Sequence, residues 1–454
     1  MNFLLFVAFL GVNFASFEAR ISESLKVSLS DGSQLIGRYL SSHSGRGIRA
    51  FLGIPYAEAP LGNLRFRDPV PKSPWTETLY ADQEANACLG VEYLFGVTES
   101  VGNEDCLYLN VYAPQNPQSK DPLPVMVYFH GGGYQSGNGG KIFYGPDYLL
   151  DHDVILVSGN YRLGIFGFLS TNTLDCPGNF GLKDQVEILK WVQKNIGQFG
   201  GDRNSVTIFG QSAGGASVTY HTISPLSKGL FHRAIPQSGT LYCLCAKRDE
   251  QVSATNARKL AEAVKCPKDD AKEMIECLRS LSSKELISHF HDFFTWDVYP
   301  LVFWGPVVEP ESEKAFLTED PSTVARIDDI PLMIGITSNE GSMISSGVAH
   351  MDDIIYLFPV MKELFFKGMP TETDDFIRKT MVSLWVNFAK FGNPTPKSDD
   401  SSLPEWKVAG SFPYDYLRIG NYHQSDAPII AMENGLYEER VLFWRKINSE
   451  LFGN

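Results

Sequence analysis

The fold is decided by the stretch Ser205-Val206-Thr207-Ile208-Phe209-Gly210-Gln211-Ser212-Ala213-Gly214. An apolar, β-branched strand leads into a serine with a glycine two positions away on each side, and small residues at 213–223 then predict a helix. Bulk at either glycine would collide with the neighbouring strand or helix, so the pattern predicts a sharp strand-to-helix turn. The turn would hold the Ser212 hydroxyl above the sheet edge, next to a helix N-terminus that favours negative charge. An ordinary turn is the alternative, but the flanking strand and helix favour a nucleophile.

Short apolar runs alternate with helical patterns along the rest of the chain. Strands are predicted at 125–129, 154–158, 205–209, 234–236, 332–337 and 416–419, and helices at 181–197 and 435–449, with another apolar stripe at Met381, Leu384, Trp385 and Phe388. This alternation indicates an α/β fold with a mostly parallel central sheet covered by helices on both faces. We expect a single domain over 20–454, because the charged stretch 247–285 is more typical of an insertion than of a domain boundary.

Composition limits the possible partners. The 454 residues include 43% hydrophobic side chains, enough for a large core, and carry a formal net charge of −14. Such a charge would be repelled by a phosphate backbone or an anionic membrane, so neither nucleic acid nor lipid headgroups are expected partners.

The N-terminus has the pattern of a secretion signal. Residues 1–12 are an apolar run that is too short to span a bilayer but suits a signal-peptide core, and small residues follow at Ala15, Ser16 and Ala19. We predict a signal peptide at 1–19 and secretion, although no basic residue precedes the run. A buried strand or helix is the alternative. No other run approaches membrane length.

Seven cysteines accompany this signal. Secretion makes disulfides expected, and the odd number leaves at least one thiol free. Spacing alone leaves the pairing open. No Asn-x-Ser/Thr sequon occurs, because Asn393 is followed by proline, so N-glycosylation is not expected.

A glycine-rich loop, His130-Gly131-Gly132-Gly133, follows the predicted strand 125–129. Consecutive glycines let backbone N–H groups point into one cavity, which suits an oxyanion hole. Removing one such donor costs on the order of 10²–10³ in rate. A flexible loop is one alternative; a dinucleotide-binding turn would need a helix where 134–140 continues as loop. His130 is expected to shape the loop, and no cofactor or metal is predicted.

A nucleophilic serine needs a base and an acid that orients it. In this architecture the order along the chain is serine, acid, histidine. Glu340 lies just past the predicted strand 332–337, at the strand end where such sheets place their chemistry, and His350 lies in the loop that follows. A surface charge or a buried structural histidine is the alternative for each residue alone.

These features together resemble the type-B carboxylesterases, which have the α/β-hydrolase fold. The resemblance covers nearly the whole chain and includes the motifs Phe51-Leu52-Gly53-Ile54-Pro55-Tyr56-Ala57, Leu64-Arg65-Phe66, Glu104-Asp105-Cys106-Leu107-Tyr108-Leu109-Asn110-Val111-Tyr112, Asn160-Tyr161-Arg162, Gly181-Leu182-Lys183-Asp184-Gln185 and Gln237-Ser238-Gly239. It implies hydrolysis of a small carboxylic ester through an acyl-enzyme.

The resemblance also assigns residues. It implies a catalytic triad of Ser212, Glu340 and His350. The oxyanion donors would be the amides of Gly132, Gly133 and Ala213, and Gln211, Ser238 and Asp353 would lie beside the triad. Disulfides Cys88–Cys106 and Cys266–Cys277 are implied as well, each contributing about 3 kcal/mol by loop entropy.

Two features narrow the substrate within the family. Cholinesterases carry a tryptophan between the first two cysteines, which binds a quaternary ammonium, and a glutamate before the serine. This chain has no tryptophan between Cys88 and Cys106 and has the neutral Gln211. A choline ester is therefore not the expected substrate. Gly210-Gln211-Ser212-Ala213-Gly214 and the loop from Gly347 to Asp353 are more similar to juvenile-hormone esterases and related secreted insect esterases.

The chain departs from the family between the acid and the histidine. Glu340 and His350 are only ten positions apart, whereas the family has a long helical segment and a strand there. Ten residues can extend roughly 33–36 Å, so contact remains possible. The shortening should leave a sheet edge unpaired and hold the triad loosely, and a misplacement near 1 Å can cost about 10²-fold in rate. A weakened or non-catalytic relative, used for binding or adhesion, is therefore the alternative function.

Overall fold

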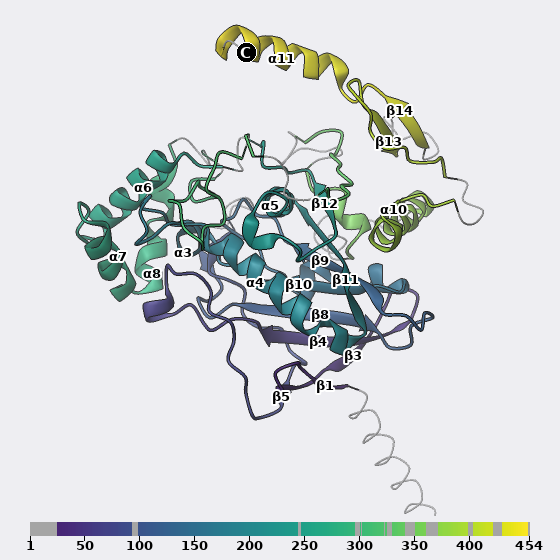
Figure 1. Cartoon of the computed structure of the whole chain (residues 1–454), viewed down its shortest axis with the longest axis horizontal. Coiled ribbons are helices and arrows are strands. Elements are labelled where there is room, and N and C mark those ends of the chain that lie inside the picture. Colours follow the sequence, from purple (N-terminus) through teal and green to yellow (C-terminus); the bar gives the residue numbers. More distant parts are fainter. Residues whose placement is uncertain are drawn as a thin grey trace, which may run out of the picture. The chain divides into compact units, whose positions relative to one another are not determined.

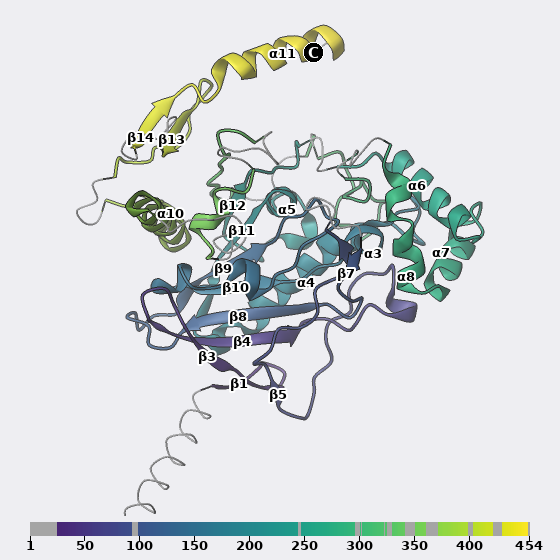
Figure 2. The same ribbon diagram turned by 180° about the vertical axis from the view of Figure 1, so that it is seen from behind.

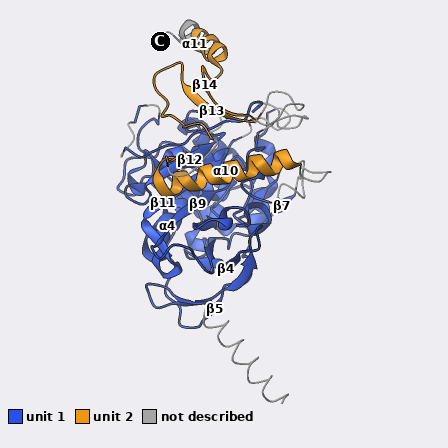
Figure 3. Cartoon of the chain, turned by 90° about the vertical axis from the view of Figure 1, so that its right-hand side faces the viewer, with its two compact units in different colours: residues 1–364 blue, residues 365–454 orange. Residues whose placement is uncertain are grey.

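The computed structural model describes residues 25–92, 99–243, 247–295, 300, 302–321, 323–324, 329–340, 350–359, 371–397, 403–420 and 429–452. They belong to two compact units, residues 1–364 and residues 365–454 (Figure 3). The predicted signal peptide at 1–19 lies outside the described residues. Among those that are described, no helix is long and apolar enough to cross a membrane.

A seven-stranded mixed sheet is the centre of the first unit (Figure 1). Its strand order is β12-β11-β9-β10-β8-β4-β3, with β3 at Arg38–Ser41, β4 at Gly47–Pro55, β8 at Tyr108–Pro114, β9 at Leu123–Phe129, β10 at Ile155–Gly159, β11 at Gly201–Gln211 and β12 at Arg233–Gln237. The pairs β10–β9, β9–β11 and β11–β12 are parallel. The pairs β3–β4, β4–β8 and β8–β10 are antiparallel. The α/β class is confirmed, and the sheet divides into a parallel and an antiparallel half.

Continuous apolar sequence explains the parallel half. In β9 the side chains of Val125, Met126, Val127, Tyr128 and Phe129 are all at most 1% exposed. Side chains alternate between the two faces of a strand, so burial of every one means that both faces are covered. The predictions at 125–129, 154–158, 205–209 and 234–236 lie inside these parallel strands except for residue 154, which immediately precedes β10, and β11 is longer than predicted at both ends.

Two helices lie across one face of the sheet. They are α4, Phe180–Asn195, and α5, Ala213–His221, and Figures 1 and 2 show both on the same side of the strands. The helix predicted at 181–197 corresponds to α4 and the 3-10 turn η4, Ile196–Phe199, after which Gly200 adopts a left-handed φ of 91°. The α5 helix starts directly after Ser212, as the sequence predicts.

The charged stretch 247–285 forms a helical group on the first unit. Helices α6, Glu250–Ala263, α7, Ala271–Ser280, and α8, Ser283–Ser288, lie together in Figure 1. Asp249, Asp270 and Ser282 cap their N-termini through side-chain oxygens. Smaller elements of this unit are β1, Lys26–Ser28, β2, Gln34–Ile36, β5, Leu79–Tyr80, β6, Gly90–Val91, β7, Ser100–Val101, α2, Lys141–Tyr144, and α3, Gly164–Phe168.

Both predicted disulfides are present. Cys88 is bonded to Cys106, and Cys266, just after α6, is bonded to Cys277 in α7. Cys243 is disulfide-bonded too, whereas Cys176 is a free and buried thiol, and burial raises its pKa to about 12.

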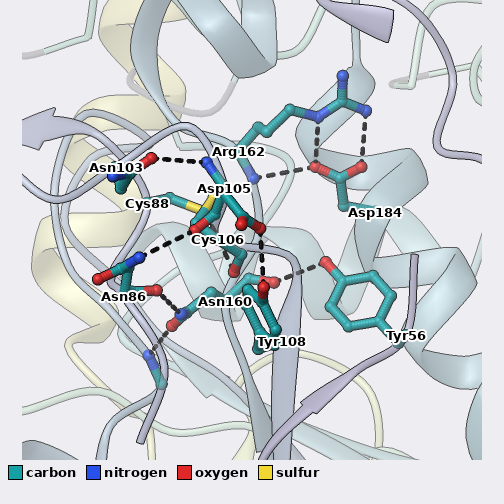
Figure 4. The surroundings of a disulfide bond; sticks show 11 residues. Tyr56, Asn86, Cys88, Asn103, Asp105, Cys106, Tyr108, Asn160, Arg162 and Asp184 are labelled. Atoms are coloured by element: carbon teal, nitrogen blue, oxygen red, sulfur yellow. Dashed lines mark hydrogen bonds and ion pairs between the residues drawn. A yellow bond between two sulfur atoms is a disulfide. The ribbon is translucent and has the colours of Figure 1, made fainter. Parts of the chain in front are cut away.

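The surroundings of the first disulfide tie several segments together (Figure 4). Arg162 donates from Nε and Nη2 to the two carboxylate oxygens of Asp184, at 2.8 and 2.7 Å. The backbone N–H of Arg162 donates to the same carboxylate at 2.9 Å. This buried, doubly hydrogen-bonded ion pair fixes the segment after β10 against α4. The Tyr56 hydroxyl donates to the Asn160 carbonyl beside it, at 2.7 Å.

The predicted strand 332–337 forms only part of a strand. It runs parallel to β12 with bridges at Ala234–Leu332 and Gln237–Gly335, and Met333 N–H donates to Ala234 at 3.0 Å. Met333 is buried, but Leu332, Ile334 and Ile336 are 37%, 55% and 51% exposed. The three exposed residues alternate along the segment, so they lie on one face of it, and that face is left largely uncovered.

The second unit has its own elements. Helix α10, Glu372–Phe391, begins with a capping box between Thr371 and Asp374 and ends at Gly392, whose φ is 67°. It contains the predicted stripe of Met381, Leu384, Trp385 and Phe388. Strands β13, Asp415–Ile419, and β14, Ile430–Asn434, pair antiparallel, and α11, Glu438–Phe452, corresponds to the helix predicted at 435–449.

Candidate active site

Ser212 stands at the turn between β11 and α5 with a strained backbone. Its φ is 58° and its ψ −122°, a conformation that side-chain-bearing residues rarely adopt. A Cβ on Gly214 would lie 2.0 Å from the Phe129 carbonyl oxygen, and a Cβ on Gly210 would lie 2.6 Å from the same atom. The glycines on both sides of Ser212 are therefore required by contact with β9. The Ser212 N–H donates to the Gln237 carbonyl at 2.9 Å, which ties the turn to β12.

The glycine-rich loop lies directly against this turn. A Cβ on Gly131 would lie 3.1 Å from the Ser212 Cβ. Gly132 and Gly133 have φ values of 107° and 61°, and a Cβ on Gly132 would lie 2.2 Å from the Ser136 carbonyl oxygen. Within the described part of the chain, neither the Gly132 nor the Gly133 amide donates a hydrogen bond. Ala213 is the first residue of α5, whose first N–H groups have no partner inside the helix.

His130 supports the loop, as the sequence predicts. Its ring is fully buried and stacks on Tyr161 with the centroids 4.3 Å apart, and the Tyr161 hydroxyl donates to the His130 carbonyl at 2.7 Å. Burial lowers the pKa of His130 to about 4, so the ring is neutral at physiological pH.

Glu340 and His350 are in contact. His350 Nδ1 lies 2.6 Å from Glu340 Oε2, and the Thr337 N–H donates to Glu340 Oε1 at 2.7 Å. Burial acts to raise the pKa of Glu340, but hydrogen bonds to His350 and the Thr337 amide, with an effect of Ser238, lower the pKa below its usual value. Glu340 is therefore ionised at neutral pH and accepts the proton of His350 Nδ1.

The other ring nitrogen of His350 does not contact the predicted nucleophile. His350 Nε2 lies 3.0 Å from Nε2 of Gln211, the residue before Ser212. Across the described residues the Ser212 hydroxyl forms no hydrogen bond with His350. The structure thus brings together the predicted acid and base, but it leaves the base facing the neighbour of the serine.

The segment after His350 is packed into the core of the first unit. Leu357 and Phe358 are 0% exposed, and the Phe358 ring contacts Tyr128 and Phe209 at centroid distances of 4.8 and 6.1 Å. His350 is therefore anchored from its C-terminal side to β9 and β11. Residues 341–349 lie outside the described residues.

Asp353 and Ser238 lie on the β12 side of the pair. Gln237 Nε2 donates to Asp353 Oδ2 at 2.6 Å, and Asp353 Oδ1 is buried with no partner among the described atoms. Burial raises the pKa of Asp353 to about 6. The Ser238 hydroxyl lies near Glu340 without a hydrogen bond of normal geometry.

Sequence reasoning missed the roles of Gln237 and Thr337. Gln237 holds the Ser212 amide with its carbonyl and Asp353 with its side chain, and Thr337 holds Glu340 with its amide. Both are strand-end residues on the side where Ser212 lies. Their position after two apolar runs is the signal that could have revealed them.

Comparison with known proteins identifies the class. The model of the carboxylesterase family matches residues 23–347 and 344–444. Esterase FE4 of Myzus persicae is 45% identical over 88% of this chain and 75% of its own length. Juvenile hormone esterase of Tribolium castaneum is 42% identical over 91% of this chain and 92% of its own length, and Venom carboxylesterase-6 of Apis mellifera is 40% identical over 73% and 59%.

The chain belongs to the carboxylesterase family, and it is a carboxylesterase by class. The two matched parts of the family model meet at residues 344–347, between Glu340 and His350. The alignment with the Tribolium relative extends over 546 positions but includes only 91% of the 454 residues here, so more than 100 positions are gaps in this chain.

Replacing Gly214 tests the close contact behind Ser212. In Gly214→Ala the new methyl group would overlap the Phe129 carbonyl, so α5 must move away from β9 and displace Ser212. We expect a loss of stability of about 1–3 kcal/mol in urea unfolding, and loss of esterase activity. Gly197→Ala is the matched control, because nothing lies within 4 Å of its added Cβ. Equal behaviour of the two variants would contradict this account.

The raised pKa of Asp353 predicts a pH-dependent stability. Between the ordinary carboxyl pKa of 3.8 and about 6, the folded protein retains a proton that the unfolded chain has released. Stability relative to Asp353→Asn should therefore fall by about 1–3 kcal/mol as pH rises from 4 to 6. Urea unfolding of both proteins across this range measures the difference, and Asp269→Asn, at an exposed site, controls for the lost charge. A difference that does not change with pH would refute the prediction.

Proposed function

We propose that the protein hydrolyses small carboxylic esters with Ser212 as nucleophile, His350 as base and Glu340 as the acid that orients it. The observation that carries this proposal is the strained Ser212 between β11 and α5, with the glycine-rich loop against it. Such strain persists only where the surrounding structure enforces it, and it keeps a serine hydroxyl exposed at a strand end. Membership of the carboxylesterase family supports the same reaction.

Each step has a residue suited to it. His350 Nε2 takes the Ser212 proton while Oγ attacks the ester carbonyl, and Glu340 stabilises the imidazolium that forms. The amides of Gly132, Gly133 and Ala213 hold the negative oxygen of the tetrahedral intermediate. The alcohol then leaves with the proton from His350, and water attacks the acyl-enzyme by the same route.

The fold proposed for this chemistry is the α/β-hydrolase fold over 20–454, with a mostly parallel sheet covered on both faces. The family match to both units supports a single domain.

The proposed substrate is an uncharged ester. Gln211 provides no negative charge beside the serine for a cationic substrate, and no tryptophan lies between Cys88 and Cys106. The similarity to Juvenile hormone esterase of Tribolium castaneum favours an ester of the juvenile-hormone class. With a net charge of −14, nucleic acid is not a proposed partner.

The alternative is a weakened or non-catalytic relative. Two observations favour it: His350 Nε2 faces Gln211, and the edge at Leu332, Ile334 and Ile336 is exposed. Both concern residues close in sequence to the short connection between Glu340 and His350 or in contact with them. The discriminating measurement is therefore activity itself.

Turnover of an aryl ester and labelling by a fluorophosphonate test the proposed nucleophile. We expect Ser212→Ala to lose both, with at least a 10³-fold drop in rate, because removing a triad member leaves only the oxyanion hole and binding. Ser205→Ala, at the polar start of the same core segment of β11, is the control and should retain both. Turnover that is equal in the wild type and Ser212→Ala would support the non-catalytic alternative.

We infer secretion from the apolar N-terminal run together with the disulfides Cys88–Cys106 and Cys266–Cys277. Expression in a secreting eukaryotic host should deliver the protein to the medium, with an N-terminus between Ala15 and Arg20 on sequencing. Retention inside the cell with Met1 in place would show that the run has another role.

A further inference from the structure

We propose that Gln211 is a positioning residue that competes with Ser212 for the base: its side-chain amide occupies His350 Nε2 in the resting protein, and His350 must leave it before Ser212 can react. This inference rests on the proposed function and goes beyond it, because it assigns Gln211 a role that limits the rate.

Hydrogen-bond chemistry fixes the direction of each contact. The Glu340 carboxylate can only accept, so His350 Nδ1 carries a proton, and Nε2 is the ring nitrogen whose lone pair can accept a hydrogen bond. The Gln211 atom at 3.0 Å is an amide nitrogen, which can only donate. Gln211 therefore donates to His350 Nε2. This is the tautomer that the reaction needs, and Gln211 stabilises it.

The same lone pair is the site that must receive the Ser212 proton. One imidazole nitrogen accepts one in-plane hydrogen bond, so the contacts to Gln211 and Ser212 exclude each other. Ser212 is adjacent to Gln211, but its φ of 58° turns the backbone sharply between the two residues. A modest rearrangement of His350 therefore decides which of the two it contacts.

Burial and strand pairing hold Gln211 in place next to His350 Nε2. It is 1% exposed, ends β11 and pairs with Gln237 of β12. The His350 side chain is 13% exposed, and that of Glu340 is 32% exposed. The acid–base pair is thus more open to solvent than the amide that it contacts, so the resting geometry is set by the rigid strand end.

The population of the competent arrangement determines the rate. A hydrogen bond of ordinary net strength would reduce the fraction of His350 that is free for Ser212 by about 3- to 10-fold. Gln211→Met removes the donor and preserves length and burial. It should raise kcat and the rate of fluorophosphonate labelling by about that factor and leave KM unchanged.

Gln211→Glu supplies the opposite change. A carboxylate beside Nε2 would favour a protonated, positively charged ring, because it accepts a hydrogen bond where the amide donates one. The acid limb of the pH–rate profile should move to higher pH, with activity at neutral pH below that of the wild type. A merely structural role for Gln211 would lower activity in both variants, so a gain in kcat in Gln211→Met is the result that distinguishes competition for the base from a structural role.

The matched control is Gln185→Met. Gln185 is buried and contacts His221 Nε2 through Oε1 at 2.9 Å, so it is a second glutamine–histidine pair, in which the glutamine accepts and Ser212 takes no part. Its loss removes a buried hydrogen bond of the same kind, and we expect no increase in kcat. An equal increase in the Gln185 and Gln211 variants would overturn the proposal.

Nitrogen NMR of histidine-labelled protein tests the contact without activity. The His350 signals are assigned by their loss in His350→Gln. The Nε2 signal should shift in Gln211→Met and stay in place in Ser212→Ala, since Gln211 and not Ser212 is its partner. A shift in Ser212→Ala with none in Gln211→Met would overturn the proposal. Loss of turnover in Ser212→Ala tests the proposed function separately, so the failure of one is distinguishable from the failure of the other.

Discussion

The close approach of three backbones around Ser212 is the constraint on which the rest of the site depends. The turn before α5 fits against β9 only because Gly214 leaves room for the Phe129 carbonyl. It fits against the end of β12 only because residue 239 is glycine, since a Cβ there would lie 2.0 Å from the Ser212 carbonyl oxygen. Three segments far apart in sequence thus determine one φ, that of Ser212. Strain of this kind persists where packing over-determines it.

The parallel half of the sheet and this turn could be predicted because their signals are local. Apolar runs such as 125–129 and glycines at fixed offsets follow from burial on both faces and from sterics. The antiparallel strands β3, β4 and β8 were not predicted as strands. In β4 a register shift between Phe51 and Ile54 interrupts the alternation of buried and partly exposed residues, so this strand lacks the regular pattern of a half-buried one. The segment 332–337 has strand composition, but a strand also needs neighbours, and among the described residues it has only isolated bridges to β12.

The sequence predicted which residues form the acid–base pair of the candidate site, but it did not predict which residue the base contacts. Residue types and chain order were sufficient to select Glu340 and His350, and ten residues allow their contact. The partner of His350 Nε2 could not be predicted from sequence, because it depends on where the loop places the ring to within about the length of one hydrogen bond. Gln211 and Ser212 are adjacent, so residue spacing does not distinguish them.

The short connection between Glu340 and His350 therefore affects the acid–base pair more than the turn at Ser212. Ser212 and the glycine loop are held by buried strands and by backbone contacts that do not involve residues 341–349. His350 is anchored from its C-terminal side through Phe358 on Tyr128, and Glu340 follows a segment in which Ile334 and Ile336 are exposed. A change in the chain between acid and base can therefore alter which donor the base contacts while the turn at Ser212 is preserved. In such an arrangement the rate depends less on which residues are present than on whether the Gln211 amide or the Ser212 hydroxyl is hydrogen-bonded to His350 Nε2.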